Sequence, residues 1–217
     1  MALIDRIQGK FVVLDGPDGS GKGTQLALLE EHLARLGAAV VRARDPGGTA
    51  IGDRIRHILL DYDLATMDVR CETLLFMASR AQLLHEVIEP SLNAGRTVLC
   101  DRFVSATCAY QGAAGYDLQR VIELARFAVG ETWPHLTLIL DVPAEVGLRR
   151  AARRAAPRGA AGTDAMESRP LDFHRKVREN FLALANVYPR PVAVVDGGGE
   201  PEAVYRRVLE AIERAVF

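Results

Sequence analysis

The sequence predicts an α/β fold with three layers, in which a five-stranded parallel sheet lies between helices. Two observations favour it: five short runs rich in Val, Leu and Ile, and longer amphipathic stretches between those runs. Apolar runs with little polar alternation are typical of strands covered on both faces. Strands that alternate with helices form parallel sheets with right-handed crossovers. The 217 residues are enough for a single domain, 1–217, and they contain no internal repeat.

The strands are expected where the apolar runs lie, at 10–15, 40–45, 97–101, 136–142 and 192–196. Helices are expected between and after them, at 22–36, 67–93, 115–129 and 201–216. The first helix has leucines at helical spacing and is followed by Gly37, a residue type common just past a helix end. The second has Pro90 near its end, and Gly130 follows the third.

Composition excludes several classes of protein. The net charge of −1 argues against a general nucleic-acid binder, which would be basic, so no nucleic-acid partner is expected. Cys71, Cys100 and Cys108 are odd in number and suit neither a zinc site nor a disulfide framework, which favours free thiols in a reducing compartment. The first ten residues do not resemble a signal peptide, and no apolar run reaches the ~20 residues that cross a bilayer. A cytoplasmic protein without a membrane partner is expected.

A phosphate-binding loop is predicted directly after the first strand. The segment GPDGSGKGT, residues 16–24, matches the pattern GxxxxGK, with a strand before it and a helix after it. Glycines let successive backbone N–H groups point inward, the helix N-terminus adds positive partial charge, and Lys22 adds a full charge. The residues expected to bind a nucleoside triphosphate are Gly16, Pro17, Asp18, Gly19, Ser20, Gly21, Lys22, Gly23 and Thr24.

Gly23 stands where this pattern usually has a Ser or Thr whose hydroxyl holds Mg²⁺. Thr24 cannot replace that hydroxyl, because the next helical residue projects about 100° further round the axis. The sequence GKGT is similar to the loop of adenylate kinases and related nucleoside monophosphate kinases of the P-loop NTPase fold. We therefore expect Mg²⁺ to be held with the phosphates by Asp15, Asp18 and Asp101, directly or through water.

Further motifs follow the loop in order: RDPGGT (44–49), FMASR (76–80), DRFVSATCAYQG (101–112), PHLTLILDVPAEVGLRR (134–150) and FHRKVRENFLALA (173–185). Together they resemble the bacterial thymidylate kinase family over residues 11–217. The resemblance implies Mg²⁺-dependent phosphorylation of dTMP to dTDP by ATP in a homodimer. An AMP- or CMP-type kinase, a deoxynucleoside kinase and a non-catalytic nucleotide-binding switch are the alternatives.

Phe76 and Arg80 are four residues apart on a predicted helix, so they share a face. A ring and a guanidinium placed in this way can stack on a base and reach its carbonyl. Phe76 is also compatible with an ordinary core position, because its neighbours 74, 75 and 77 are apolar. The resemblance implies that Phe76 stacks on thymine and that Arg80 donates to a thymine carbonyl.

Asp101 and Arg102 follow the third strand, at the carboxyl edge where open α/β sheets bind ligands. Arg102 suits a bidentate grip on an acceptor phosphate, and Arg44 is a second candidate. A salt bridge at the strand end is the alternative for the Asp101–Arg102 pair.

The resemblance assigns further residues to the dTMP site. It implies that Tyr110 packs under the deoxyribose and leaves no room for a 2′-hydroxyl, and that Thr107 and Gln111 line the base or sugar pocket. It also implies that Asp18 lies near the 3′-hydroxyl and Mg²⁺, and that Pro46 forms a wall beside the base.

Residues 149–169 contain six arginines and are expected to form a cationic lid, with a solvated helix followed by a surface loop as the alternative. A phosphate monoester is largely dianionic near pH 7, so transfer requires cations and exclusion of water more than a general base. Gly19 stands where some members of the resembled family carry an arginine; other members use lid arginines. Arg149 and Arg153 share a helix face, as do Arg150 and Arg154. The residues expected to act in catalysis are Asp18, Lys22, Arg102, Arg153 and Arg158.

The lid departs from the resembled family at one position. The family pattern D-R-x-E reads Asp164-Ala165-Met166-Glu167 here, so its arginine is missing. We expect either that Arg158 takes over this role or that turnover is slower.

Overall fold

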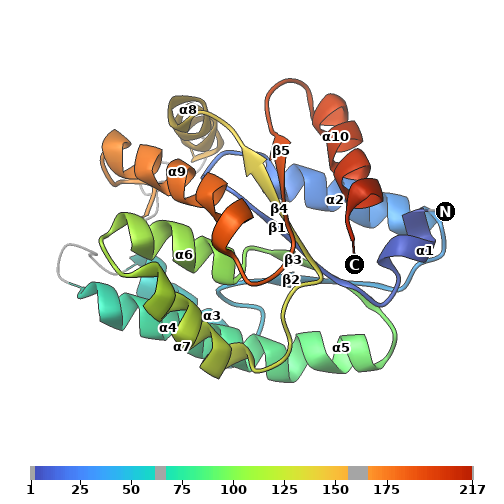
Figure 1. The fold of residues 1–217 in the computed structure, drawn as a ribbon, viewed down its shortest axis with the longest axis horizontal. Coiled ribbons are helices and arrows are strands. Elements are labelled where there is room, and N and C mark those ends of the chain that lie inside the picture. Colours follow the sequence, from blue (N-terminus) through green and yellow to red (C-terminus); the bar gives the residue numbers. More distant parts are fainter. Residues whose placement is uncertain (1–2, 62–66, 156–165, 217) are drawn as a thin grey trace.

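The computed structural model describes residues 3–61, 67–155 and 166–216. In these residues five strands form one parallel sheet in the order β2-β3-β1-β4-β5 (Figure 1). The strands are β1 (Phe11–Asp15), β2 (Val40–Arg44), β3 (Thr97–Asp101), β4 (Leu136–Asp141) and β5 (Val192–Asp196). The predicted α/β fold is confirmed, and each strand lies within one residue of its expected bounds.

Helices cover both faces of the sheet, which explains the lack of alternation in the strands (Figure 1). In β1, Phe11 and Val13 belong to one apolar core, whereas Val12 and Leu14 belong to another. The second core is closed by α1 (Leu3–Ile7), α2 (Lys22–Arg35) and α10 (Pro201–Arg214). The first core is closed by α4 (Val69–Leu83), α6 (Val104–Ala113), α7 (Leu118–Val129) and α9 (Leu171–Val187).

The long helical stretch expected at 67–93 is divided. It comprises α4, a π-helical turn η1 (Leu84–Ile88) and α5 (Glu89–Asn93). Pro90 lies at the start of α5 and has no N–H to donate to the preceding turn. The regular α-helical hydrogen bonds are therefore interrupted there, and the π-helical turn η1 precedes it. No helix was expected from the sequence at α1, α3 (Ala50–Asp61), α6 or α9. Of these, α3 and α6 follow the ends of β2 and β3.

Several polar side chains lie at the carboxyl edge of the sheet. Asp15 ends β1, Arg44 ends β2 and Asp101 ends β3, and Arg44 is the register partner of Asp101. The helix α8 (Ala144–Ala155) begins after β4 at the same edge. Across residues 3–61, 67–155 and 166–216, no helix combines the length and apolarity needed to cross a membrane.

Candidate active site

The loop between β1 and α2 curls through glycines. Gly16, Gly19 and Gly21 have φ angles of 136°, 71° and 98°, a region that other residues rarely adopt. A Cβ atom at Gly19 would also overlap the carbonyl oxygen of Gly147 in α8, so the loop can approach this helix closely only with glycine at position 19. The structure therefore gives a steric reason why this chain carries no arginine there.

Lys22 is the first residue of α2, and its side chain folds back over the loop. Its Nζ atom donates to the carbonyl oxygens of Gly16 and Pro17, each at 2.9 Å. Burial lowers the pKa of Lys22 to about 8, and the nearby Arg102 guanidinium acts in the same direction. An arriving polyphosphate would favour the charged form of this amine.

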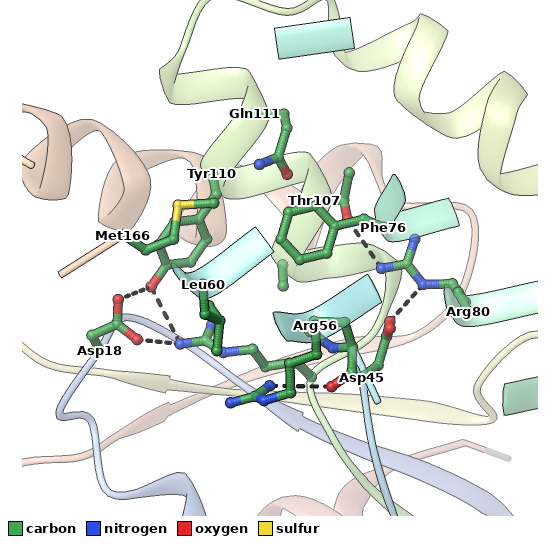
Figure 2. A pocket seen from close by; sticks show the side chains of 13 residues that line it. Asp18, Asp45, Arg56, Leu60, Phe76, Arg80, Thr107, Tyr110, Gln111 and Met166 are labelled. Atoms are coloured by element: carbon green, nitrogen blue, oxygen red, sulfur yellow. Dashed lines mark hydrogen bonds and ion pairs between the residues drawn. The ribbon is translucent and has the colours of Figure 1, made fainter. Parts of the chain in front are cut away.

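Two hollows meet at this edge of the sheet. One, the loop cavity, is lined by loop residues and arginines: Asp18, Gly19, Gly21, Lys22, Gly23, Thr24, Arg44, Arg56, Asp101, Arg102, Arg150, Arg154 and Glu167. The other, the α6 pocket, is shown in Figure 2 and lined by Asp18, Asp45, Pro46, Arg56, Leu60, Phe76, Arg80, Arg102, Ala106, Thr107, Tyr110, Gln111 and Met166. Asp18, Arg56 and Arg102 line both, so the two hollows share a wall.

The predicted site residues divide between these hollows. Six of the nine loop residues line the loop cavity, whereas Gly16, Pro17 and Ser20 are buried and are not among its lining residues. All the predicted acceptor residues except Arg44 line the α6 pocket. Arg44 lines the loop cavity instead, where its Nη2 atom lies 3.3 Å from Asp53.

Arg56 was missed by the sequence reasoning, although it lines both hollows. Its Nη1 atom donates to the carbonyl oxygen of Pro46 at 3.1 Å (Figure 2). The helix α3, which starts at Ala50, carries Arg56 back over the pocket within two turns. A helix predicted at 50–61 would have placed Arg56 near the end of β2 and so revealed it as a candidate.

Arg102 lines both hollows, and its guanidinium contacts polar groups of each. Its φ of 67° is unusual for a residue other than glycine, and this conformation immediately follows β3. The guanidinium donates to the Asp18 carboxylate and to the carbonyl oxygen of Gly16, the latter at 3.2 Å. The Tyr110 hydroxyl donates to the other oxygen of Asp18 at 2.6 Å (Figure 2). Burial opposes ionisation of Asp18, but Arg102 and Lys22 outweigh it, so the pKa of Asp18 is lowered.

Asp15, Asp18 and Asp101 differ in their access to a metal. Asp15 is buried beneath the loop, where it accepts from the Gly16 N–H at 2.9 Å and from the Ser105 hydroxyl at 2.6 Å. Burial raises the pKa of Asp15, and Asp15 lines neither hollow. Asp18 and Asp101 both face the loop cavity. The described part of the chain contains no group of three or more acidic, His or Cys side chains able to hold a metal.

Arg80 is buried beside the α6 pocket and is held by several partners. Its Nε atom lies 2.7 Å from Asp45, and its Nη2 atom donates to Thr107 Oγ1 at 3.0 Å and to the Phe103 carbonyl oxygen at 3.1 Å. Burial raises the pKa of Asp45, and Arg80 opposes that change. Phe76 is partly buried: it packs against the core, and it also lines the pocket.

The helix α8 presents Arg150 and Arg154 to the loop cavity. Arg150 donates to the carbonyl oxygen of Gly197 at 3.2 Å, and Arg154 lies 2.7 Å from Glu167. The predicted Arg153 is exposed and is not among the residues lining the cavity. Arg158 and Ala165 lie outside the described residues. The cavity therefore favours one of the two arginine pairs expected from helical spacing, the pair 150 and 154.

Comparisons with known proteins agree with this geometry. The thymidylate kinase family model matches residues 14–208. A thymidylate kinase of Geobacter sp. (strain M21) is 45% identical over 207 residues, which are 95% of this chain and 92% of that relative. One from Deinococcus radiodurans is 45% identical, covering 94% of this chain and 97% of its own length. The crystal structure of thymidylate kinase from Ehrlichia chaffeensis superposes with a TM-score of 0.75 at 28% identity, covering 94% of this chain and 98% of that one. The chain belongs to the thymidylate kinase family.

Proposed function

We propose that this protein transfers the γ-phosphoryl group of ATP to dTMP, giving ADP and dTDP. The observation that carries the proposal is the wall shared by the loop cavity and the α6 pocket, formed by Asp18, Arg56 and Arg102. A triphosphate on the loop and a monophosphate in the pocket would meet at this wall. Membership of the thymidylate kinase family supports the same reaction.

Each hollow supplies what its substrate needs. In the loop cavity, Lys22 and the backbone N–H groups of the loop bind phosphates, and Arg150 and Arg154 add charge from the lid side. In the α6 pocket, Phe76 presents a ring to the base, and Arg80 lies at the same wall. The Arg102 guanidinium attracts the acceptor phosphate and, with Arg56, offsets repulsion between the two anions.

The acceptor oxygen needs little activation, because a phosphate monoester is largely dianionic near pH 7. Asp18 is already held by Arg102 and Tyr110, so it orients the Arg102 guanidinium and does not act as a general base. The position of Asp18 therefore suits a phosphate acceptor better than the neutral sugar hydroxyl of a deoxynucleoside, which requires a free carboxylate base.

Mg²⁺ fits the loop cavity with the help of the substrate. Asp101 and Asp18 would hold it together with phosphate oxygens and water, because no carboxylate cluster of the described chain is complete by itself. When bound, the ion would neutralise charge on the phosphates of ATP. Asp15, hydrogen-bonded beneath the loop, supports the loop and Arg102.

A coupled ADP-release assay with dTMP, dUMP, dCMP, AMP and thymidine tests the proposal. We expect dTMP to be turned over most efficiently. An AMP- or CMP-type kinase would prefer another monophosphate, a deoxynucleoside kinase would prefer thymidine, and a non-catalytic switch would release ADP with none of them. Any of these three results would contradict the proposed reaction.

We also propose that residues 1–217 act as one catalytic domain within a cytoplasmic homodimer that needs no nucleic-acid or membrane partner. The large apolar side chains of Leu74 on α4 and Phe127 on α7 are 55% and 92% exposed in the single chain. Their exposure supports an apolar face that the second subunit covers in the dimer. Cys71, Cys100 and Cys108 are free thiols, which suits a reducing compartment. Sedimentation of the wild type and of Phe127→Glu tests the dimer: a monomeric wild type would contradict it.

A further inference from the structure

Glu72 on α4 is a buried carboxylate that has no role in the proposed reaction as described so far; it is 1% exposed. Its two oxygen atoms have different partners. Oε1 accepts a hydrogen bond from Nε2 of Gln111 on α6, and Oε2 lies 3.1 Å from Nη2 of Arg169, just before α9. One carboxylate therefore connects the wall of the α6 pocket to the end of the predicted lid segment, 149–169.

The Glu72 carboxylate determines which way the Gln111 amide points. An ionised carboxylate only accepts hydrogen bonds, whereas an amide has a donor end and an acceptor end. Turning the amide over would place its carbonyl oxygen against Glu72, so that two acceptors would face each other. The amino end of Gln111 therefore faces Glu72, and its Oε1 atom points elsewhere.

The Oε1 atom of Gln111 is an unsatisfied acceptor at the pocket wall. It is buried and has no hydrogen-bond partner in the part of the chain that the structure describes. Figure 2 shows the Gln111 amide above the space between Tyr110 and Phe76. A buried acceptor without a partner is costly, so a ligand that brings a donor is favoured there. Thymine and uracil carry an N–H at N3, whereas cytosine carries a lone pair at N3.

Arg169 makes it possible for Glu72 to be buried as a carboxylate. A buried charge is destabilising unless an opposite charge and hydrogen bonds compensate it. The Arg169 side chain is only 20% exposed, and its guanidinium lies 4.6 Å from the centre of the Phe173 ring. The same short segment contributes Met166 to the α6 pocket.

We propose that Glu72 is a positioning residue which, compensated by Arg169, fixes the Gln111 amide so that the pocket prefers pyrimidines with an N–H at N3. The proposal deepens the proposed function and rests on it for the α6 pocket being the acceptor site. Glu72 touches no substrate in this role; it acts through Gln111.

The test compares dTMP with 5-methyl-dCMP, which has the same methyl group but an acceptor at N3. Calorimetric titration without ATP gives the ratio of their affinities, and steady-state assays with saturating ATP give kcat and KM. In Glu72→Gln the partner of Gln111 can donate or accept, so the amide is no longer fixed. We expect the preference for dTMP to fall about tenfold, with KM for dTMP rising and kcat changing by less than about twofold.

Variants at Arg169 provide the second measurement. Arg169→Gln removes the compensating charge and should lower the dTMP preference in the same direction, whereas Arg169→Lys keeps the charge and should retain most of it. Arg175→Gln is the matched control, because Arg175 on α9 also binds a carboxylate, Glu145, at 2.7 Å but lies outside both hollows. It should leave the preference unchanged.

A folded Glu72→Gln protein that keeps the wild-type affinity ratio would overturn the proposal. If that variant does not fold, an Arg169→Gln protein with the wild-type ratio would overturn it equally. A wild type that binds both nucleotides equally well would also contradict it. If the wild type prefers dTMP in binding but does not phosphorylate it, the proposed function fails, and the affinity ratios of the variants still decide whether Glu72 positions Gln111.

Discussion

The Nε atom of Arg80 lies 2.7 Å from Asp45, and each of the two side chains is only 1% exposed. With Thr107 and the Phe103 carbonyl oxygen as further partners, the guanidinium is held in one place at the pocket wall. A buried ion pair of this kind adds little stability compared with apolar residues, but breaking it is costly, because one charge is left without a partner. Its part here is to hold an arginine rigidly at the wall of the α6 pocket, where the proposed function places the acceptor base.

Asp45→Asn should therefore destabilise the protein and weaken dTMP binding together. We expect the free energy of unfolding to fall by about 3–5 kcal/mol, since Arg80 stays buried without its counter-charge. Urea denaturation measures this change, and the KM for dTMP measures the loss at the site. Asp53→Asn is the matched control: it breaks the exposed pair with Arg44, which should cost about 1 kcal/mol or less. Equal effects in the two variants would contradict the assignment.

ATP binding should depend on pH through Lys22. Its pKa in the folded protein is about 8, below the ordinary 10.5, so the folded chain loses this charge earlier than the unfolded chain as pH rises. Lys22 alone therefore makes the free energy of unfolding increase between these two values, because the unfolded state binds the extra proton there. Over the same range ATP must bring a proton back to Lys22, so its affinity should decrease above pH ~8.

Calorimetry near pH ~8.5, in two buffers that differ in ionisation enthalpy, measures this proton uptake. Lys22→Met is the control, because it has no proton to gain at this position. An ATP affinity that stays constant from about pH 7 to about pH 9 would show that Lys22 remains charged in the free protein.

Arginine substitutions in α8 should have unequal effects. Both Arg153 and Arg154 are exposed, but only Arg154 is among the residues that line the loop cavity. We expect Arg154→Ala to lower kcat about 100-fold, because a charge near the transferred phosphoryl group is lost, and Arg153→Ala to change it by less than about twofold. Rates at saturating ATP and dTMP measure both. The reverse order would place the other face of α8 toward the phosphates.

The Tyr110 hydroxyl should matter for rate more than for sugar selection. It donates to Asp18 at 2.6 Å, and Asp18 in turn orients Arg102. Removing one hydrogen bond to a carboxylate costs about 1.5–3 kcal/mol, so Tyr110→Phe should lower kcat/KM for dTMP roughly 10- to 100-fold. The ring remains, and the preference for dTMP over its ribonucleotide should persist. Tyr205→Phe, which loses a hydrogen bond to the distant His32, should leave kcat/KM unchanged.

The sequence by itself determined the strands, the loop and most of the residues that line the α6 pocket. The inner strands β1, β3 and β4 are buried on both faces, so they were visible as mainly apolar runs. The edge strands β2 and β5 are partly exposed, and β2 includes Arg42 between its apolar residues. The loop at 16–24 was visible because its glycines and lysine are close in sequence and lie between a strand and a helix. Most of the residues predicted for the acceptor site were named through the family resemblance, and all of the predicted set except Arg44 line the α6 pocket.

Only the tertiary structure decided contacts between segments far apart in the chain. It placed Arg44 in the loop cavity and Asp15 beneath the loop, and it brought Arg56 to the wall between the two hollows. Helical spacing defined two arginine pairs in α8, but the packing of that helix against the loop decided which pair lines the cavity. Glu72 had no signal of its own, because its meaning depends on Gln111 and Arg169 meeting it in space. Local patterns encode periodicity and loop chemistry, whereas the direction of each side chain depends on how the helices pack on the sheet.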